Sequence, residues 1–118
     1  MATDAYIGDS FVFQVLYYDS GSLPVAVTNP TITLFVFDPV TGDRILLVDA
    51  DTMNAVVPSD PGRYVYRWTI PTSLSDGAVM YADYRATVVD TGTRASGEDT
   101  FNIKSRAGYL GLRARFLP

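Results

Sequence analysis

The 118-residue chain contains no cysteine and no histidine, and its only lysine is Lys104. Without cysteine there is no disulfide, no thiolate nucleophile and no cysteine–zinc site. Without histidine the chain lacks the side chain that most often serves as general base or metal ligand near neutral pH. Catalysis would have to rely on a carboxylate pair or on the lone lysine, so we expect a protein that is not an enzyme and that carries no cofactor.

Export and membrane signals are missing as well. Residues 1–6 contain neither a basic stretch nor an apolar run, so they do not resemble a signal peptide. No window approaches the roughly 20 apolar residues of a membrane span. Asn29-Pro30-Thr31 comes close to a glycosylation sequon, but its proline disqualifies it. These absences predict a soluble protein, and the length suits a single domain.

The residues that are abundant favour β-structure. Apolar residues make up 47% of the chain and aromatic residues 13%, which is enough for a packed core. Runs rich in aromatic and β-branched residues recur at short intervals, separated by turn residues. No stretch shows a 3.6-residue period, and only 71–76 is compatible with a helical turn. We expect strands over residues 10–18, 25–27, 31–37, 44–48, 55–57, 63–70, 78–89 and 94–103.

This pattern predicts an all-β fold, an antiparallel sandwich of seven to eight strands. Alternation within strands assigns residues to its faces. It places Ile32, Leu34 and Val36 on one face of 31–37. In 78–89 the inward set is Ala78, Met80, Ala82, Tyr84, Ala86 and Val88.

Aromatic residues form a second alternating set, with Tyr64, Tyr66 and Trp68 followed by Ile70. Flat aromatic rings on an exposed sheet face suit sugar rings, but rings at this spacing more often form the core wall between two sheets. We expect the core wall. Tyr17 and Tyr18 are adjacent and must point to opposite faces, so we expect one of them to be exposed.

Core and turn motifs resemble those of bacterial and phage immunoglobulin-like modules, over about residues 8–103. The resemblance rests on Gly8-Asp9-Ser10-Phe11, Asp38-Pro39-x-Thr41-Gly42, Gly62-Arg63-Tyr64-x-Tyr66-x-Trp68-x-Ile70-Pro71, Gly77, Tyr81 and Phe101-x-Ile103. It implies an immunoglobulin-like sandwich. Modules of this kind occur as decoration or cement proteins on tailed-phage capsids, as appendages of tails and fibres, and as repeats in bacterial adhesins. A free-standing module without cysteine resembles the phage structural kind most.

The acidic residues suggest two kinds of site, and we expect neither. Carboxylates gathered at one end of a sandwich hold calcium in some proteins, but aspartate is also favoured in turns. The pairs Asp49/Asp51 and Glu98/Asp99 resemble acid/base pairs for sugar chemistry, yet neighbours in sequence do not face a common substrate. We expect solvated turn acids, namely Asp19, Asp38, Asp43, Asp49, Asp51, Asp60, Asp76, Asp90, Glu98 and Asp99.

Charge divides the chain in two. Residues 1–103 contain all thirteen acids and five arginines, a net charge of −8, whereas 104–118 contain four basic residues and no acid, a net charge of +4. Such a change of sign marks a compositional boundary. We therefore expect a sandwich domain over 1–103 and a basic, aromatic tail or added strand over 104–118, called here the C-terminal segment.

The C-terminal segment is the sharpest signal for binding. Burying its five large apolar side chains yields roughly 7–15 kcal/mol, whereas ordering the fourteen residues 105–118 costs on the order of 14–28 kcal/mol. It therefore needs main-chain pairing, salt links or a partner's surface. The residues that we expect to bind a partner are Arg106, Tyr109, Leu110, Leu112, Arg113, Arg115, Phe116 and Leu117.

Three partners compete for this segment: the protein's own sheet, a neighbouring subunit or shell protein, and a nucleic acid or membrane. A domain of charge −8 repels phosphates, and four basic residues give only a modest counterion-release term, which argues against the last. The alternation of Tyr109, Gly111, Arg113 and Arg115 allows a strand, and a strand added to a partner's edge satisfies the first two together.

Together with the resemblance, these observations favour a virion structural protein, made in the host cytoplasm, of the capsid decoration or cement type. Its partners would be copies of itself, a major shell protein, or both, with neither nucleic acid nor membrane. The alternative is a sugar- or receptor-binding module of a phage tail fibre or of an adhesin at the cell surface. That alternative predicts an exposed aromatic cluster and dependence on calcium.

Overall fold

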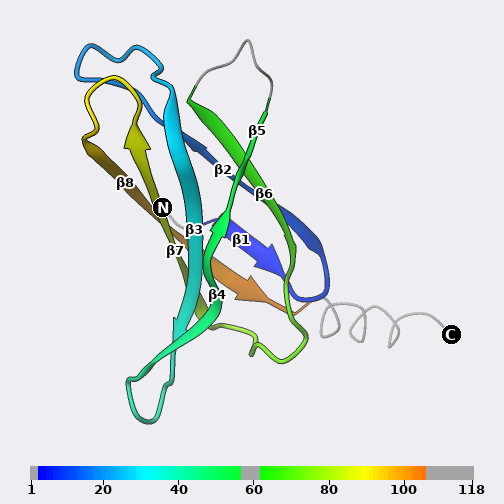
Figure 1. The fold of residues 1–118 in the computed structure, drawn as a ribbon. Helices are drawn as coiled ribbons and strands as arrows, with labels where there is room; N and C mark the ends of the chain where they lie inside the picture. The colour runs from blue at the N-terminus through cyan, green and yellow to red at the C-terminus, as the bar shows by residue number, and fades with distance from the viewer. Residues whose placement is uncertain (1–2, 57–61, 106–118) are drawn as a thin grey trace, which may run out of the picture.

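The computed structural model describes residues 3–56 and 62–105, and this part of the chain contains eight strands and no helix (Figure 1). The prediction of an all-β fold with seven to eight strands is confirmed. No helix of the described residues is long and apolar enough to cross a membrane. The strands are β1 (Thr3–Tyr6), β2 (Ser10–Leu16), β3 (Val27–Phe37), β4 (Arg44–Thr52), β5 (Asn54–Ala55), β6 (Arg63–Thr69), β7 (Val79–Val88) and β8 (Arg94–Lys104).

The strands form two sheets that enclose the core between them. One sheet has five strands in the order β1-β8-β7-β3-β4, and the other has three in the order β2-β6-β5. Every pair is antiparallel except β1 with β8, so the expectation of antiparallel pairing throughout is wrong at that edge. The sequence pattern did not predict β1, because its four residues contain no apolar run. Pairing with β8 and full burial of Ala5 hold it in place.

Strand β3 corrects a second expectation, a break at Asn29-Pro30. The strand continues through both residues by means of a bulge, where the register with β7 shifts between Thr28 and Thr31. Asn29 takes a positive φ of 51°, which asparagine tolerates better than most residues. Proline has no N–H to donate, and a bulge is one of the few places where a sheet accepts it.

The chain passes between the sheets through connections of very different lengths. Between β4 and β5 a single residue, Met53, makes the crossing, and its N–H donates to the Pro30 carbonyl at 2.8 Å. Between β6 and β7 the chain forms turns rather than the helical turn that residues 71–76 allowed, with the Leu74 N–H donating to the Pro71 carbonyl at 3.3 Å.

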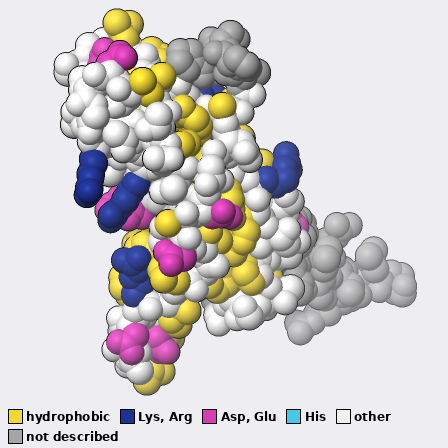
Figure 2. Space-filling view, in the orientation of Figure 1, with side chains coloured by type: hydrophobic (Ala, Val, Ile, Leu, Met, Phe, Trp, Pro, Cys, Tyr) yellow, Lys and Arg dark blue, Asp and Glu magenta, His cyan; other side chains and the backbone are white. Residues whose placement is uncertain are grey.

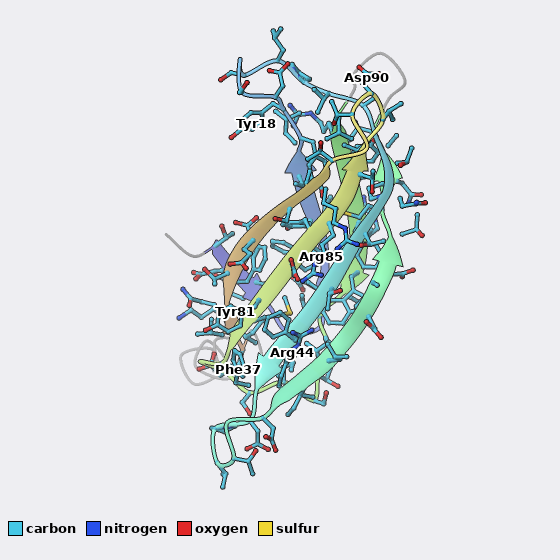
Figure 3. All side chains as sticks on the ribbon, turned by 60° about the vertical axis from the view of Figure 1, so that its left-hand side comes forward. Tyr18, Phe37, Arg44, Tyr81, Arg85 and Asp90 are labelled. Atoms are coloured by element: carbon cyan, nitrogen blue, oxygen red, sulfur yellow. The ribbon has the colours of Figure 1, made fainter. Side chains whose placement is uncertain are left out.

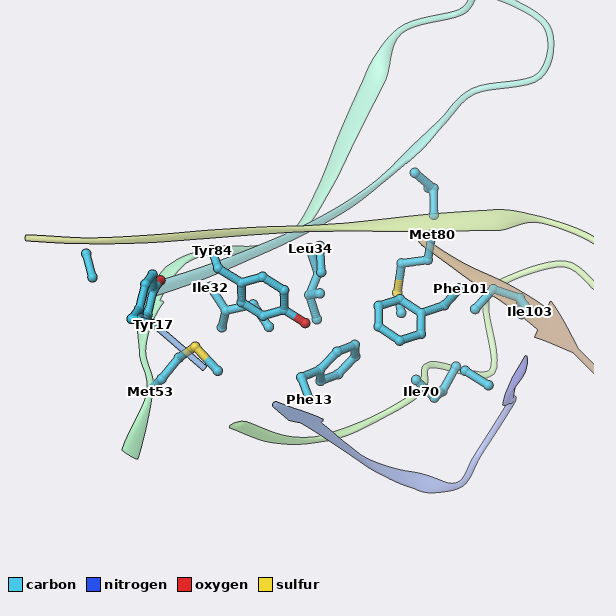
Figure 4. Close-up of a cluster of buried hydrophobic side chains, with 14 of the residues drawn as sticks. Phe13, Tyr17, Ile32, Leu34, Met53, Ile70, Met80, Tyr84, Phe101 and Ile103 are labelled. Atoms are coloured by element: carbon cyan, nitrogen blue, oxygen red, sulfur yellow. The ribbon is translucent and has the colours of Figure 1, made fainter. Parts of the chain in front are cut away.

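Aromatic and aliphatic side chains from both sheets fill the interior (Figure 4). Phe13 of β2 lies near its centre, 1% exposed, and its ring contacts Phe11, Phe101 and Trp68 at centroid distances of 4.8, 5.1 and 6.4 Å. Among the residues predicted to face inward, the buried ones are Ile32, Leu34, Val36, Met80, Ala82, Tyr84 and Ala86. Alternation therefore identified the inner faces of β3 and β7 correctly.

The stripe of Tyr64, Tyr66 and Trp68 packs against this core, as expected, although each side chain stays partly exposed. The Tyr66 hydroxyl donates to Asp51 Oδ2 at 2.6 Å and so links β6 of one sheet to β4 of the other. Burial, together with the hydrogen bond and the charge of Asp51, raises the pKa of Tyr66 to about 12. Tyr17 is buried at 5% exposure and Tyr18 is 61% exposed, which confirms that they point to opposite sides.

Candidate protein-binding surfaces

The residues predicted to bind a partner, Arg106, Tyr109, Leu110, Leu112, Arg113, Arg115, Phe116 and Leu117, lie outside the described residues. The structure does fix the point from which they continue. The Lys104 carbonyl accepts a hydrogen bond from the Ile7 N–H at 2.9 Å, and the Ser105 N–H donates to Asp76 Oδ1 at 2.6 Å. The C-terminal segment therefore starts beside the turn that leads into β2.

The described body is acidic, but its charge is dispersed. It contains twelve acidic and six basic residues, a net charge of −6. On the face shown in Figure 2 the acidic side chains form separate small groups among hydrophobic and basic ones. No group of three or more acidic residues among the described ones is arranged to hold a metal ion.

The prediction that the acids occupy turns is wrong at four positions. Asp49 and Asp51 lie within β4, and Glu98 and Asp99 lie within β8. Strand β4 is an edge strand with two register shifts and a positive φ at Ala50, so it tolerates residues that are rare in strands. Asp51 is also held by its hydrogen bond from Tyr66.

An aromatic patch, defined as Phe35, Phe37 and Tyr81, lies on the outer face of the five-stranded sheet, which is turned away from the core. Figure 3 shows Phe37 and Tyr81 on this face, and Phe35 alternates with the buried Leu34 and Val36 along β3. Phe35 and Tyr81 stack with centroids 5.4 Å apart and an interplanar angle of 16°. Phe37 packs edge-on against both, at 5.6 and 5.4 Å, and is 49% exposed. The Arg44 guanidinium carbon lies 4.4 Å from the Phe35 centroid, a cation–π contact.

Charged residues continue this outer face along β7 and β8. Asp83 accepts from the Nε of Arg85 at 3.2 Å and forms an ion pair with its NH2 group at 3.1 Å. Glu98 lies opposite Asp83 in the β7–β8 register. Aromatic rings bordered by charged side chains are common in protein–protein interfaces. The rings bury a large surface area on binding, and the charged side chains fix the orientation of the partner.

Sequence reasoning missed the aromatic patch, although part of the signal was present. Alternation placed Phe35, Phe37 and Tyr81 opposite the core-facing residues of their own strands. What brings them together is the pairing of β3 with β7, which sets Phe35 opposite Tyr81, and nothing local in the sequence specifies that pairing. Beside the patch lies a shallow groove, which is lined by Phe37, Leu74, Asp76, Val79 and other residues.

Comparison of the chain with models of known families, with curated proteins and with solved structures finds no match.

Proposed function

We propose that the protein is a non-enzymatic, immunoglobulin-like structural protein that assembles with neighbouring protein subunits, of the kind that decorates a virion. The strand order supports the immunoglobulin-like assignment. In a variable-type immunoglobulin sandwich the sheets contain strands GFCC′ and BED. Taking β1 as a first strand that joins the GFCC′ sheet, β8-β7-β3-β4 corresponds to GFCC′ and β2-β6-β5 to BED. The chain departs from antibody domains in having no cysteine pair.

One observation carries the assembly role: the described strands already enclose a contiguous core before the C-terminal segment begins. The buried core side chains of the described residues run from Ala5 to Ile103. From this we infer that the basic and apolar residues beyond Lys104 serve to bind a neighbouring subunit. Residues 1–103 carry a net charge of −8 and the C-terminal segment carries +4, so the two attract each other across a subunit boundary, and the apolar side chains add affinity.

The virion assignment rests on the resemblance to phage immunoglobulin-like modules and on the chemistry of the surfaces. A dispersed acidic surface and an exposed aromatic patch suit binding to protein rather than to nucleic acid. A capsid decoration or cement protein needs these properties, and the partners would be other copies, a shell protein, or both.

Truncation after Lys104 tests the assembly role. We expect the full-length protein to form an oligomer at micromolar concentrations and the truncated protein to be a monomer, since truncation removes the attracting charge and the apolar contacts. Light scattering measures both masses, and circular dichroism checks that the truncated chain keeps its strands. A truncated protein that assembles like the full-length one, or a full-length protein that stays monomeric, contradicts tail-mediated self-assembly.

The aromatic patch favours a second candidate, a sugar- or receptor-binding module. The stripe of Tyr64, Tyr66 and Trp68 packs on the core, so Phe37 and Tyr81 would have to supply the stacking platform. On a glycan array, with and without calcium, this candidate predicts binding that Phe37→Ala reduces by about two- to tenfold, since one stacked ring is worth roughly 0.5–1.5 kcal/mol. Phe37→Ala should leave the fold intact because the ring lies outside the core. Absence of binding in both conditions removes the candidate.

A further inference from the structure

Four strands lie at sheet edges, and three of them have a usual protection against pairing with another chain within the described residues. β1 has only four residues and includes Asp4, and β5 has two residues. β4 contains charged residues and register shifts. β2 is seven residues long, runs without a register shift, and contains neither a charged residue nor a proline. Its outer edge has no strand partner within residues 3–56 and 62–105.

The register with β6 shows which main-chain groups of β2 are left over. The Tyr17 N–H donates to the Gly62 carbonyl at 2.8 Å, and the Ile70 N–H donates to the Asp9 carbonyl at 2.9 Å. Residues of an antiparallel strand alternate between pointing their N–H and C=O groups toward one neighbour and toward the other. The main-chain groups directed away from β6 therefore belong to Ser10, Val12, Gln14 and Leu16.

We propose that residues 109–115 of a second copy pair with this free edge of β2 as an added strand. The proposal rests on the proposed function, because it names the place on the neighbour where the C-terminal segment docks. Residues 109–115 of the C-terminal segment match β2 in length, and their alternation of apolar and polar residues matches that of β2. With Val12 opposite Arg113, the apolar Leu110, Leu112 and Ala114 fall on the side of the buried Phe13, and the polar residues fall on the solvent side.

Strand direction favours a second copy over the protein's own segment. β1 and β8 run parallel, and β2 runs back after a tight turn in which the Asp9 N–H donates to the Tyr6 carbonyl at 3.1 Å. The protein's own segment, starting from Lys104 at that end, would run parallel to β2. A second copy can approach in the opposite direction, and antiparallel pairs are slightly more stable per residue.

Because the chain has no cysteine, single cysteines report this contact cleanly. One protein carries Val12→Cys and a second carries Arg113→Cys, and the two are mixed under mild oxidation. Facing residues of a hydrogen-bonded antiparallel pair have Cα atoms about 5.5 Å apart, which is within the usual Cα separation across a disulfide. The matched control replaces Val12→Cys with Val79→Cys, since Val12 is 36% and Val79 38% exposed and Val79 lines the groove near Asp76.

We expect the mixed dimer of Val12→Cys with Arg113→Cys to form at least about tenfold faster than the control dimer, because the docked strand raises the local concentration of the two thiols. Mass spectrometry identifies the mixed dimer. Equal rates, or faster reaction at Val79→Cys, overturn the proposal. So does a double variant, Val12→Cys with Arg113→Cys, that closes its disulfide only within one chain. If assembly still depends on the segment when β2 fails to react, the proposed function stands and only the docking place is wrong.

Discussion

Replacing Gly62 with alanine is expected to destabilise the fold by about 2–5 kcal/mol, the sum of the cost of a left-handed backbone for a non-glycine residue and of overpacking. Gly62 has a φ of +85° where the chain enters β6. A Cβ built there would lie 2.5 Å from the Tyr17 carbonyl oxygen and 2.8 Å from that of Val25. Both are main-chain atoms, so neither can move aside as a side chain would.

Gly42→Ala is the matched control for this effect. Gly42 has a similar φ of +77°, but a Cβ there meets nothing within 4 Å. Gly42→Ala should therefore lower the free energy of unfolding only by the cost of a left-handed backbone, about 1–2 kcal/mol. Urea unfolding of the two variants and the parent separates backbone strain from steric overlap. Equal losses of stability at both positions would show that the close approach at Gly62 contributes nothing.

Phe13→Ala is expected to lower the free energy of unfolding by about 3–5 kcal/mol, the usual cost of removing a fully buried phenylalanine. The ring is 1% exposed and lies edge-on to Phe11 and Phe101, so its removal leaves a cavity between the two sheets and deletes both ring contacts. A marginally stable domain of this size loses a large part of its stability by that change.

Val12→Ala, one residue earlier on the same strand, is the control. Its side chain is 36% exposed and faces away from the core, so we expect a loss of roughly 0.5 kcal/mol. Chemical unfolding monitored by Trp68 fluorescence follows both variants. A loss at Phe13 no larger than that at Val12 would contradict the central place given to Phe13 in the core.

Much of the sandwich could be predicted because its signals are local. A period of two in β3 and β7 specified which residues face inward, and Gly and Pro marked most turns. β1 was not predicted because its pairing with β8, rather than its own residues, makes it a strand. The continuation of β3 through Pro30 was not predicted for the same reason, since it depends on a bulge against β7 and on a hydrogen bond from the Met53 N–H.

The candidate binding surfaces also differ in whether local sequence or strand pairing specifies them. The C-terminal segment was identified from its charge and its apolar side chains, which are properties of the sequence. The aromatic patch depends on β3 lying beside β7, and the free edge of β2 depends on β1 joining the other sheet. Strand order is a long-range property, so alternation can say that Phe37 and Tyr81 face outward but not that they touch.

The parallel pairing of β1 with β8 has a mechanical consequence. A force that pulls residue 3 and residue 104 apart acts along these two strands in opposite directions. It loads their paired residues, from Thr3 with Phe101 to Tyr6 with Lys104, at the same time and in shear. The hydrogen bonds between the two strands must then break together rather than one after another. The β1–β8 pair is therefore expected to resist unfolding under tension applied to these two residues.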